Sequence, residues 1–275
     1  DWEGIVCAIG YPKDYGDAPT NGTAPDNSNT NNYGTPSHQI TQSIYLGNVP
    51  ADQDTAHQSS PNADGDDNDT AGDDEEGVTF PNLTIGSTKT ITVSVTGAGG
   101  YLQGWIDWNG DGDFNDTVDG TSEQIIVNAQ DNTTTVAGRT DDSDTIVGQI
   151  SIAVSVPPSA ITTAPTFARF RWSTTLDLNS DSAAENGEVE DYAHTVLAGQ
   201  TLEGIVFEDI DYGGGAGRDQ TTSSGVGVNG ATVEIYDSTG TFVATTTPES
   251  ALFHFFRLRR KDGSQVAPML ETEAV

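Results

Sequence analysis

The stretch Tyr101-Leu-Gln-Gly-Trp-Ile106 runs directly into Asp107-Trp-Asn-Gly-Asp-Gly-Asp113. Its first half is apolar and aromatic, which predicts a β-strand. Its second half carries oxygen-bearing side chains at alternate positions, and Gly112 permits the sharp bend that brings such side chains around one centre. No convincing amphipathic helix pattern follows. The junction therefore predicts strands that are joined by acidic loops.

The spacing of acidic residues in this loop is that of a calcium site, because carboxylate and amide oxygens are the ligands that Ca²⁺ prefers. An EF-hand is not expected, since its twelfth position, counted from Asp107, is Val118 and not a bidentate Glu. We expect the shell to close with Asp116, Asp119 or a distant carboxylate. The alternative is a solvated Asp/Gly hairpin. The candidate ligands in the loop are Asp107, Asn109, Asp111, Asp113 and Asp116.

The chain is strongly acidic, with 42 Asp and Glu against 10 Lys and Arg in 275 residues and a formal net charge of −32. That balance argues against nucleic acid or an anionic membrane as a partner unless cations intervene. It also calls for counter-ions, and Ca²⁺ at several sites is the cofactor that we expect. Cys7 is the sole cysteine, so a disulfide framework or a cysteine zinc site within one chain is excluded.

The composition, rich in Asn, Thr, Ser, Gly and Asp, is typical of a secreted microbial surface protein. The sequence begins with Asp1 and shows neither a signal peptide nor a membrane span. We therefore expect a mature extracellular or cell-surface protein.

Short apolar runs rich in Thr, Val and Ile between residues 78 and 192 predict an all-β fold, an antiparallel β-sandwich with long acidic loops. The expected strands are 88–95, 101–108, 124–127, 146–156 and 166–172. The bulky residues of the last run do not alternate cleanly, so Arg169 and Arg171 are expected to anchor carboxylates or pack on an aromatic ring. Residues 14–77 consist mostly of turn formers, so ions or packing partners must order them.

Six motifs resemble the GEVED domain family, in the order in which that family carries them. They are Asp14-Tyr-Gly-Asp-Ala-Pro19, Tyr33-Gly-Thr-Pro36 with His38, Asp73-Asp-Glu-Glu-Gly-Val78 with Phe80, Trp105-Ile-Asp-Trp-Asn-Gly-Asp-Gly-Asp113, Ala168-Arg-Phe-Arg171 and Gly187-Glu-Val-Glu-Asp-Tyr192. The resemblance covers residues 11–197. It implies a non-catalytic domain of large secreted or surface-attached microbial proteins, often found beside adhesin-like repeats.

The last motif places Glu188 and Glu190 on one side of a strand. They are expected to complete the metal shell of the Asp107 loop, or to pair with Arg169 and Arg171. The alternative is an exposed acidic edge that discourages aggregation. The acidic run 64–76 adds two further candidate metal ligands, which are Asp73 and Asp74.

A second, smaller immunoglobulin-like β-sandwich is expected over residues 198–275. Its start is similar to the B-repeat-like modules of bacterial adhesins, and that resemblance implies calcium ligands at Asp209, Asp211 and Asp219. Residues 249–261 stand where the closing strands of such a module belong. Either the sandwich is shortened and ends in an unusual strand, or something else completes it. The tail 249–275 contains four of the ten basic residues of the chain, crowded into residues 257–261, and their role stays unexplained.

The apolar run within residues 1–10 predicts a lone strand. Because it stands at the opposite end of the chain from the incomplete module, it is a candidate donor strand for a neighbouring copy, and such head-to-tail pairing would build a filament. The alternative is pairing within its own chain.

Enzyme chemistry is not expected. His38, His57, His194 and His254 lack metal-binding spacing and are expected at turns or on the surface, and no Gly-x-Ser-x-Gly or phosphate loop is present. The favoured function is a calcium-stabilised structural or adhesive surface protein that self-associates or binds neighbouring β modules.

The alternative function is a carbohydrate-binding or accessory module with a glycan or surface target. Exposed, coplanar aromatic rings would favour this function, and buried rings would favour a core. The aromatic residues in question are Tyr101, Trp105, Trp108 and Trp172.

Overall fold

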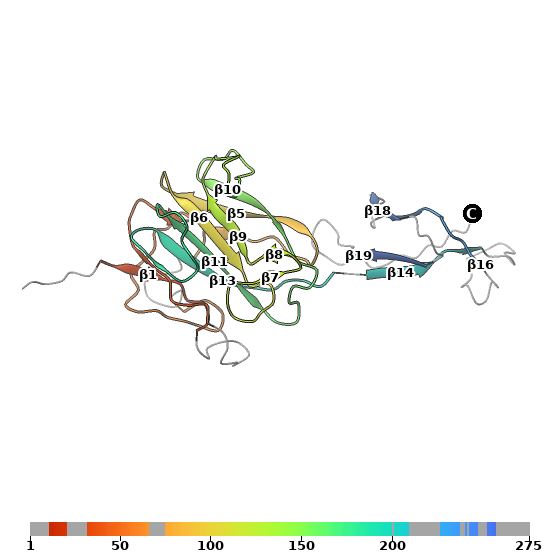
Figure 1. The fold of residues 1–275 in the computed structure, drawn as a ribbon, viewed down its shortest axis with the longest axis horizontal. Coiled ribbons are helices and arrows are strands. Elements are labelled where there is room, and N and C mark those ends of the chain that lie inside the picture. The colour runs from red at the N-terminus through yellow and green to blue at the C-terminus, as the bar shows by residue number, and fades with distance from the viewer. Residues whose placement is uncertain are drawn as a thin grey trace, which may run out of the picture. The chain divides into compact units, whose positions relative to one another are not determined.

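The structure is a computed structural model that describes residues 11–20, 32–65, 75–199, 201–208, 226–236, 240, 242–246 and 252–256. The chain forms two compact units, residues 1–197 and 198–275. The described ranges contain β-strands and no helix, so the all-β prediction is confirmed (Figure 1). Accordingly, no helix within those ranges has the length and apolar character needed to cross a membrane.

Two antiparallel sheets form a sandwich in the first unit (Figure 1). The first sheet has the order β10-β5-β3, and β4 also pairs with β5. Its strands are β3 (Tyr45–Leu46), β4 (Val78–Thr79), β5 (Thr88–Thr96) and β10 (Gln149–Ser155). The second sheet has the order β13-β11-β6-β9. Its strands are β6 (Tyr101–Ile106), β9 (Gln124–Ala129), β11 (Thr166–Ser173) and β13 (Glu188–His194).

The main core lies between these sheets. Alternation along β5 and β10 points apolar side chains such as Val93 and Ile152 inward, while Ala168, Phe170 and Trp172 point inward from β11. The five strands predicted between residues 88 and 172 are thus present, and the alternation along β5 is one reason that the two sheets pack.

A third layer covers the other face of β11. It is a small sheet of order β1-β2-β12, formed by β1 (Lys13–Tyr15), β2 (Ser37–Gln39) and β12 (Ala183–Ala184). A second apolar cluster lies outside the main core and combines this N-terminal part with both central strands of the sheet. Its members are Ala18, Tyr33, Ala63, Trp105, Phe114 and Phe167.

Because β11 is covered on both faces, all eight of its residues are buried. This explains why its bulky residues do not alternate with polar ones. Residues 11–20 and 32–65, whose composition alone suggests disorder, are tied to this sheet, for example by the hydrogen bonds between Ala18 and Asp191 and between Tyr33 and Asp107. Contacts within the chain hold these residues in place.

A short hairpin leads into β9. It pairs β7 (Thr117–Val118) with β8 (Thr121–Ser122). Its two-residue turn, Asp119 and Gly120, has positive φ at both positions, as a type I′ turn requires.

The second unit contains three antiparallel pairs of strands in its described residues. They are β14 (Thr201–Ile205) with β19 (Leu252–Phe256), β15 (Phe207–Glu208) with β16 (Val226–Gly227), and β17 (Val233–Tyr236) with β18 (Phe242–Thr246). Residues 252–256 therefore form a strand that pairs with the first strand of the unit. The candidate donor residues 1–10 lie outside the described residues.

Candidate metal site

Asp107 forms the internal frame of the acidic loop after β6. Its side chain is fully buried, and its Oδ1 accepts a hydrogen bond from the Gly110 N–H at 2.6 Å. Its Oδ2 accepts from the Gly112 N–H at 3.0 Å and from the Tyr33 hydroxyl at 2.6 Å. Asp107 thus folds the loop around its own carboxylate and ties it to the N-terminal part of the unit.

Glu123 closes the loop from the other side, and the sequence analysis did not single it out. It is fully buried, and its two carboxylate oxygens accept from the Trp108 and Asp116 N–H groups, each at 3.0 Å. The only sequence signal for this role is an acidic residue directly before the β9 run. A carboxylate that accepts from both ends of the loop fixes the loop's width.

Three carboxylates converge on the outer side of this frame. Each of Asp111, Asp113 and Asp116 offers one oxygen, and these oxygens all lie within 4.8 Å of one another. Two oxygens bound to the same Ca²⁺ are at most about 5 Å apart, since each Ca–O distance is about 2.3–2.6 Å. Asp111 is exposed and the other two are half-buried, which leaves room for water ligands. The three carboxylates could therefore bind one metal ion together.

Asn109 lies beside this cluster and holds it together in the structure. Its Nδ2 donates to Asp111 Oδ2 at 3.2 Å and to Asp116 Oδ2 at 2.9 Å. Its Oδ1 accepts from the Asp111 N–H at 3.1 Å. The amide nitrogen, and not the oxygen, thus faces the carboxylates here.

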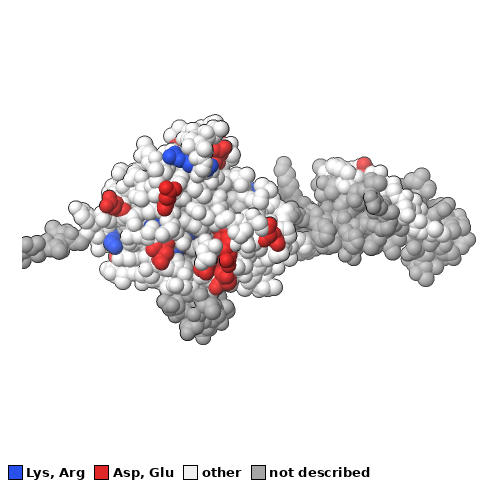
Figure 2. All heavy atoms as spheres, in the orientation of Figure 1, with Lys and Arg blue, Asp and Glu red and all other residues white. Residues whose placement is uncertain are grey.

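Burial raises the pKa values of three acids in this region, and repulsion between carboxylates adds to the rise for two of them. Burial, then the hydrogen bond to Asp116 and the charges of neighbouring carboxylates, raise the pKa of Asp111 to about 6. Burial, with the charges of Asp107 and Asp111, raises the pKa of Glu123 to about 7. Burial also raises the pKa of Asp107. A cation at the cluster would relieve this repulsion. Acidic side chains also gather in patches over the visible face of the first unit, with few basic ones between them (Figure 2).

Three acids predicted or considered for the shell lie elsewhere and do not belong to the cluster. Glu188 Oε2 accepts from the Leu46 N–H, and Glu190 accepts from the Gly77 N–H at 3.0 Å. Asp119 accepts from the Ser159 N–H at 2.7 Å. The remaining predicted ligands, Asp73, Asp74, Asp209, Asp211 and Asp219, lie outside the described residues.

The two buried arginines of β11 have different partners. Arg169 forms a bidentate pair with Asp191, with both nitrogen–oxygen distances at 2.6 Å, as expected for a carboxylate anchor. Asp191 lies on the opposite side of β13 from Glu188 and Glu190. Pairing with the arginines was one of the two roles expected for the glutamates, whereas the observed partner of Arg169 is Asp191.

Arg171 binds backbone oxygens and a histidine. It donates to the carbonyl oxygens of Asn179 and Ser182, each at 2.6 Å, and to His38 Nε2 at 3.0 Å. Burial, followed by the charge of Arg169, lowers the pKa of Arg171 to about 9. Burial, followed by the charge of Arg171, holds the pKa of His38 well below its usual value, so His38 is neutral. His38 is fully buried, so its predicted surface position is wrong.

The aromatic residues considered for carbohydrate binding do not form an exposed face. Trp105, Trp108 and Trp172 are at most 3% exposed, because they pack in the two apolar clusters of the first unit. Tyr101 is half-buried, and the Arg139 guanidinium lies over its ring at 4.9 Å. The three tryptophans therefore form core and not a sugar-binding face.

Part of the chain matches a known protein family. Residues 101–195 match the GEVED domain family. The match runs from the start of β6 past the end of β13, so it contains the whole acidic loop, the two arginines and the motif at Gly187. The GEVED resemblance predicted for residues 11–197 is thereby shown for this part. No curated protein and no solved structure matches the chain.

Proposed function

We propose that this chain is a calcium-stabilised, non-catalytic structural or adhesive protein of a microbial cell surface, which associates with further copies of itself. The convergence of Asp111, Asp113 and Asp116 carries the calcium part of this proposal. The match of residues 101–195 to the GEVED domain supports a domain of that kind. The extracellular location and the adhesive role rest on composition and on the resemblance described above.

Calcium is the cation that suits this cluster best. Its ligands are hard oxygens, and Ca²⁺ tolerates the irregular shells that exposed loops provide. Mg²⁺ demands near-ideal octahedral geometry at shorter distances and gives up its water reluctantly. The loop would supply three carboxylates, and Asn109 would add a fourth ligand if its amide turned its oxygen toward the ion.

Calcium binding would stabilise more than the loop itself. The Gly112 carbonyl accepts from the Asn32 N–H at 2.8 Å, and Tyr33 donates to Asp107. The loop is thus joined to the N-terminal layer that covers β11. An ion that holds the loop in this conformation therefore stabilises the attachment of that layer as well.

Thermal unfolding of the purified full chain, in calcium and in chelator, tests this function. A ligand at about 100 times its Kd stabilises the folded state by about 2.7 kcal/mol. We expect calcium to raise the melting temperature of the wild type, and the double variant D111N/D113N to lose that response. The matched control D119N, whose carboxylate accepts from Ser159 outside the cluster, should keep it. An equal response in all three proteins would rule out this site.

A further inference from the structure

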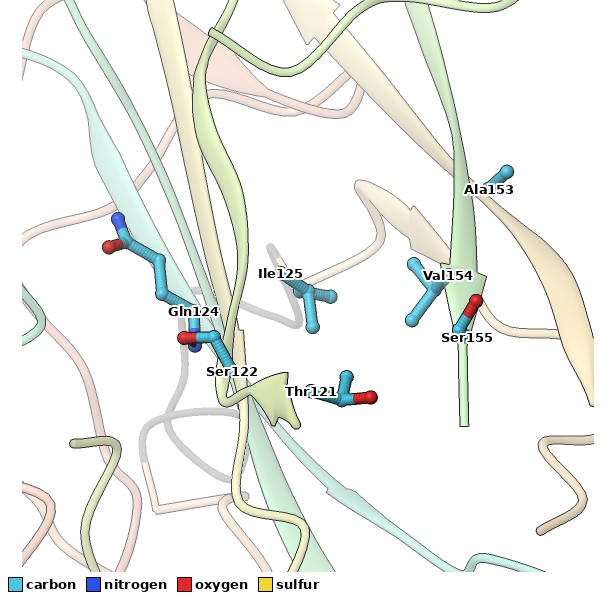
Figure 3. Close-up of a pocket in the computed structure, with 7 residues that line it drawn as sticks. All are labelled: Thr121, Ser122, Gln124, Ile125, Ala153, Val154 and Ser155. Atoms are coloured by element: carbon cyan, nitrogen blue, oxygen red, sulfur yellow. Dashed lines mark hydrogen bonds between the residues drawn. The ribbon is translucent and has the colours of Figure 1, made fainter. Parts of the chain in front are cut away.

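One side of the sandwich has a hollow between the two sheets. Its volume is about 170 Å³, and β8, β9 and β10 line it. Ile125 and Val154 face each other across it, with Thr121 at one end (Figure 3). All of the residues that line the hollow are uncharged, although the chain as a whole carries −32 charges.

The strand β10 presents backbone groups at this hollow. In the pairing of β10 with β5, the Val156 N–H donates to the Ser87 carbonyl, and the Val95 N–H donates to Gly148. These bonds fix the register, so the even-numbered residues of β10 bond to β5. The odd-numbered residues therefore point their N–H and C=O groups away from the sheet, toward the outer edge.

The first half of that edge is capped by the chain itself. The Ser151 N–H donates to Asp142 Oδ1 at 3.0 Å, and its carbonyl accepts from the Ser143 N–H at 2.9 Å. The Gln149 N–H donates to the Ile146 carbonyl at 3.1 Å. The loop before β10 thus covers the outward groups where the strand begins.

The second half of the edge is open. Ala153 and Ser155 are exposed, and no described residue caps their outward N–H or C=O groups. Unpaired edge groups of this kind are a template for an added strand. The open positions lie beside the hollow, so an added strand would pair with β10 and cover Ile125 with its side chains.

The occupant must be extended, uncharged and apolar on one face. A charged side chain would lose its hydration in the uncharged hollow without gaining a partner, which costs free energy. A further carboxylate would also be repelled by the negative charge of this chain. Residues 4–10, Gly-Ile-Val-Cys-Ala-Ile-Gly, meet this description, and Ile5, Cys7 and Ile9 share one face of an extended chain. Seven residues span about 23 Å as a strand, which is longer than the open stretch of β10.

We infer that the open edge of β10 accepts residues 4–10 of a second copy of this chain as an added strand. This inference rests on the proposed self-association and is independent of calcium. It places the acceptor in the first unit, whereas the sequence analysis placed it in the second, whose first strand already pairs with β19. The donor and acceptor are different surfaces, so the contact is head-to-tail and can extend into a chain of molecules.

Sedimentation analysis of the full chain tests the inference with two variants. A153P/S155P removes the two outward N–H donors of β10, and proline is tolerated at such edge positions because the N–H it lacks faces outward. I5D/I9D places charges on the proposed donor face. V147D, at an apolar side chain that is 85% exposed and outside the hollow, is the control. Thermal melts verify that each variant is folded.

A seven-residue strand covers much less than the roughly 1,600 Å² of a standard interface, so protein concentrations of about 0.1–1 mM are appropriate. The wild type and V147D should self-associate in calcium and in chelator. The two other variants should each associate at least about tenfold more weakly. A mixture of I5D/I9D with A153P/S155P should form 1:1 heterodimers, because one retains the acceptor and the other the donor.

Every other outcome contradicts the inference in a distinct way. A wild type that stays monomeric overturns it. If only A153P/S155P loses self-association, two β10 edges pair with each other. If only I5D/I9D loses it, the N-terminal residues associate through an apolar contact elsewhere. Self-association that requires calcium would assign assembly to the metal site. If calcium does not raise the melting temperature, the proposed metal site is wrong, but the test of strand addition is unaffected.

Discussion

Glu123 is a buried acid whose neighbours are also acids, and its titration can be observed in the stability of the protein. Its folded pKa of about 7 lies above the ordinary value of 4.5, because burial and the charges of Asp107 and Asp111 oppose ionisation. A raised folded pKa gives stability that is complete below pH 4.5 and is lost as the pH rises toward 7. In chelator, the free energy of unfolding should therefore fall across that range, by an amount on the order of 1–3 kcal/mol.

Chemical denaturation at a series of pH values in chelator measures this loss. Glu123→Gln cannot ionise, so its stability should depend less steeply on pH between 4.5 and 7 than that of the wild type. Glu185→Gln, at an exposed carboxylate, should leave the wild-type slope unchanged. If Glu123→Gln also retains the wild-type slope, other carboxylates carry the pH dependence.

The acidic loop shows what sequence can and cannot predict for single residues. Alternate spacing identifies a set of oxygen ligands, and three members of that set lie together in the structure. Spacing cannot show that Asp107 turns inward, because its partner Tyr33 lies 74 residues away in sequence. Nor can it show the role of Glu123, whose two acceptor bonds depend on how the loop closes.

At the level of elements, Gly187 allows the start of β13 to approach the end of β11 closely. Gly187 has φ of +103°, and a Cβ at this position would lie 1.9 Å from the Trp172 carbonyl oxygen. Gly187→Ala must therefore move the start of β13 away from the end of β11. We expect a loss of about 3 kcal/mol or more in the free energy of unfolding, because backbone strain and a backbone clash add.

Gly120→Ala is the matched control for this substitution. Gly120 also has positive φ, +81°, but no atom lies within 4 Å of its added Cβ. Its cost should be limited to the conformational penalty of about 1–2 kcal/mol. Urea unfolding, followed by tryptophan fluorescence, gives the free energy of unfolding of both variants. Equal decreases in the two variants would show that the Trp172 carbonyl moves aside without cost.

The central strands were predictable because their signal is local. The segments that form β5, β6, β9, β10 and β11 each contain enough apolar residues to be predicted as strands from their own sequence. The strands β1, β2 and β12 have two or three residues each and no such pattern. They exist because residues far along the chain bind their side chains: Arg171 donates to His38 of β2, and the Val189 N–H donates to Asp14 Oδ2 of β1.

For the whole molecule, the net charge of −32 offers two explanations for any stabilisation by calcium. One is general screening of carboxylate repulsion, and the other is binding at the cluster of Asp111, Asp113 and Asp116. The two differ in concentration dependence. At 0.15 M salt the screening length is already about 8 Å, so about 1 mM CaCl₂ adds almost nothing to screening. Binding at a site, by contrast, saturates at concentrations set by Kd.

We therefore expect about 1 mM CaCl₂ in about 0.15 M NaCl to raise the melting temperature by about 5–10 °C, which corresponds to the stabilisation of a ligand near 100 times its Kd. Extra NaCl of equal ionic strength should have no measurable effect. MgCl₂ at the same concentration should give a smaller rise, because Mg²⁺ retains its water and fits an irregular shell poorly. Differential scanning calorimetry of the full chain distinguishes these cases. An equal rise with both divalent cations would mean that charge density alone stabilises the protein, and the converged carboxylates would then be an acidic surface without selectivity for calcium.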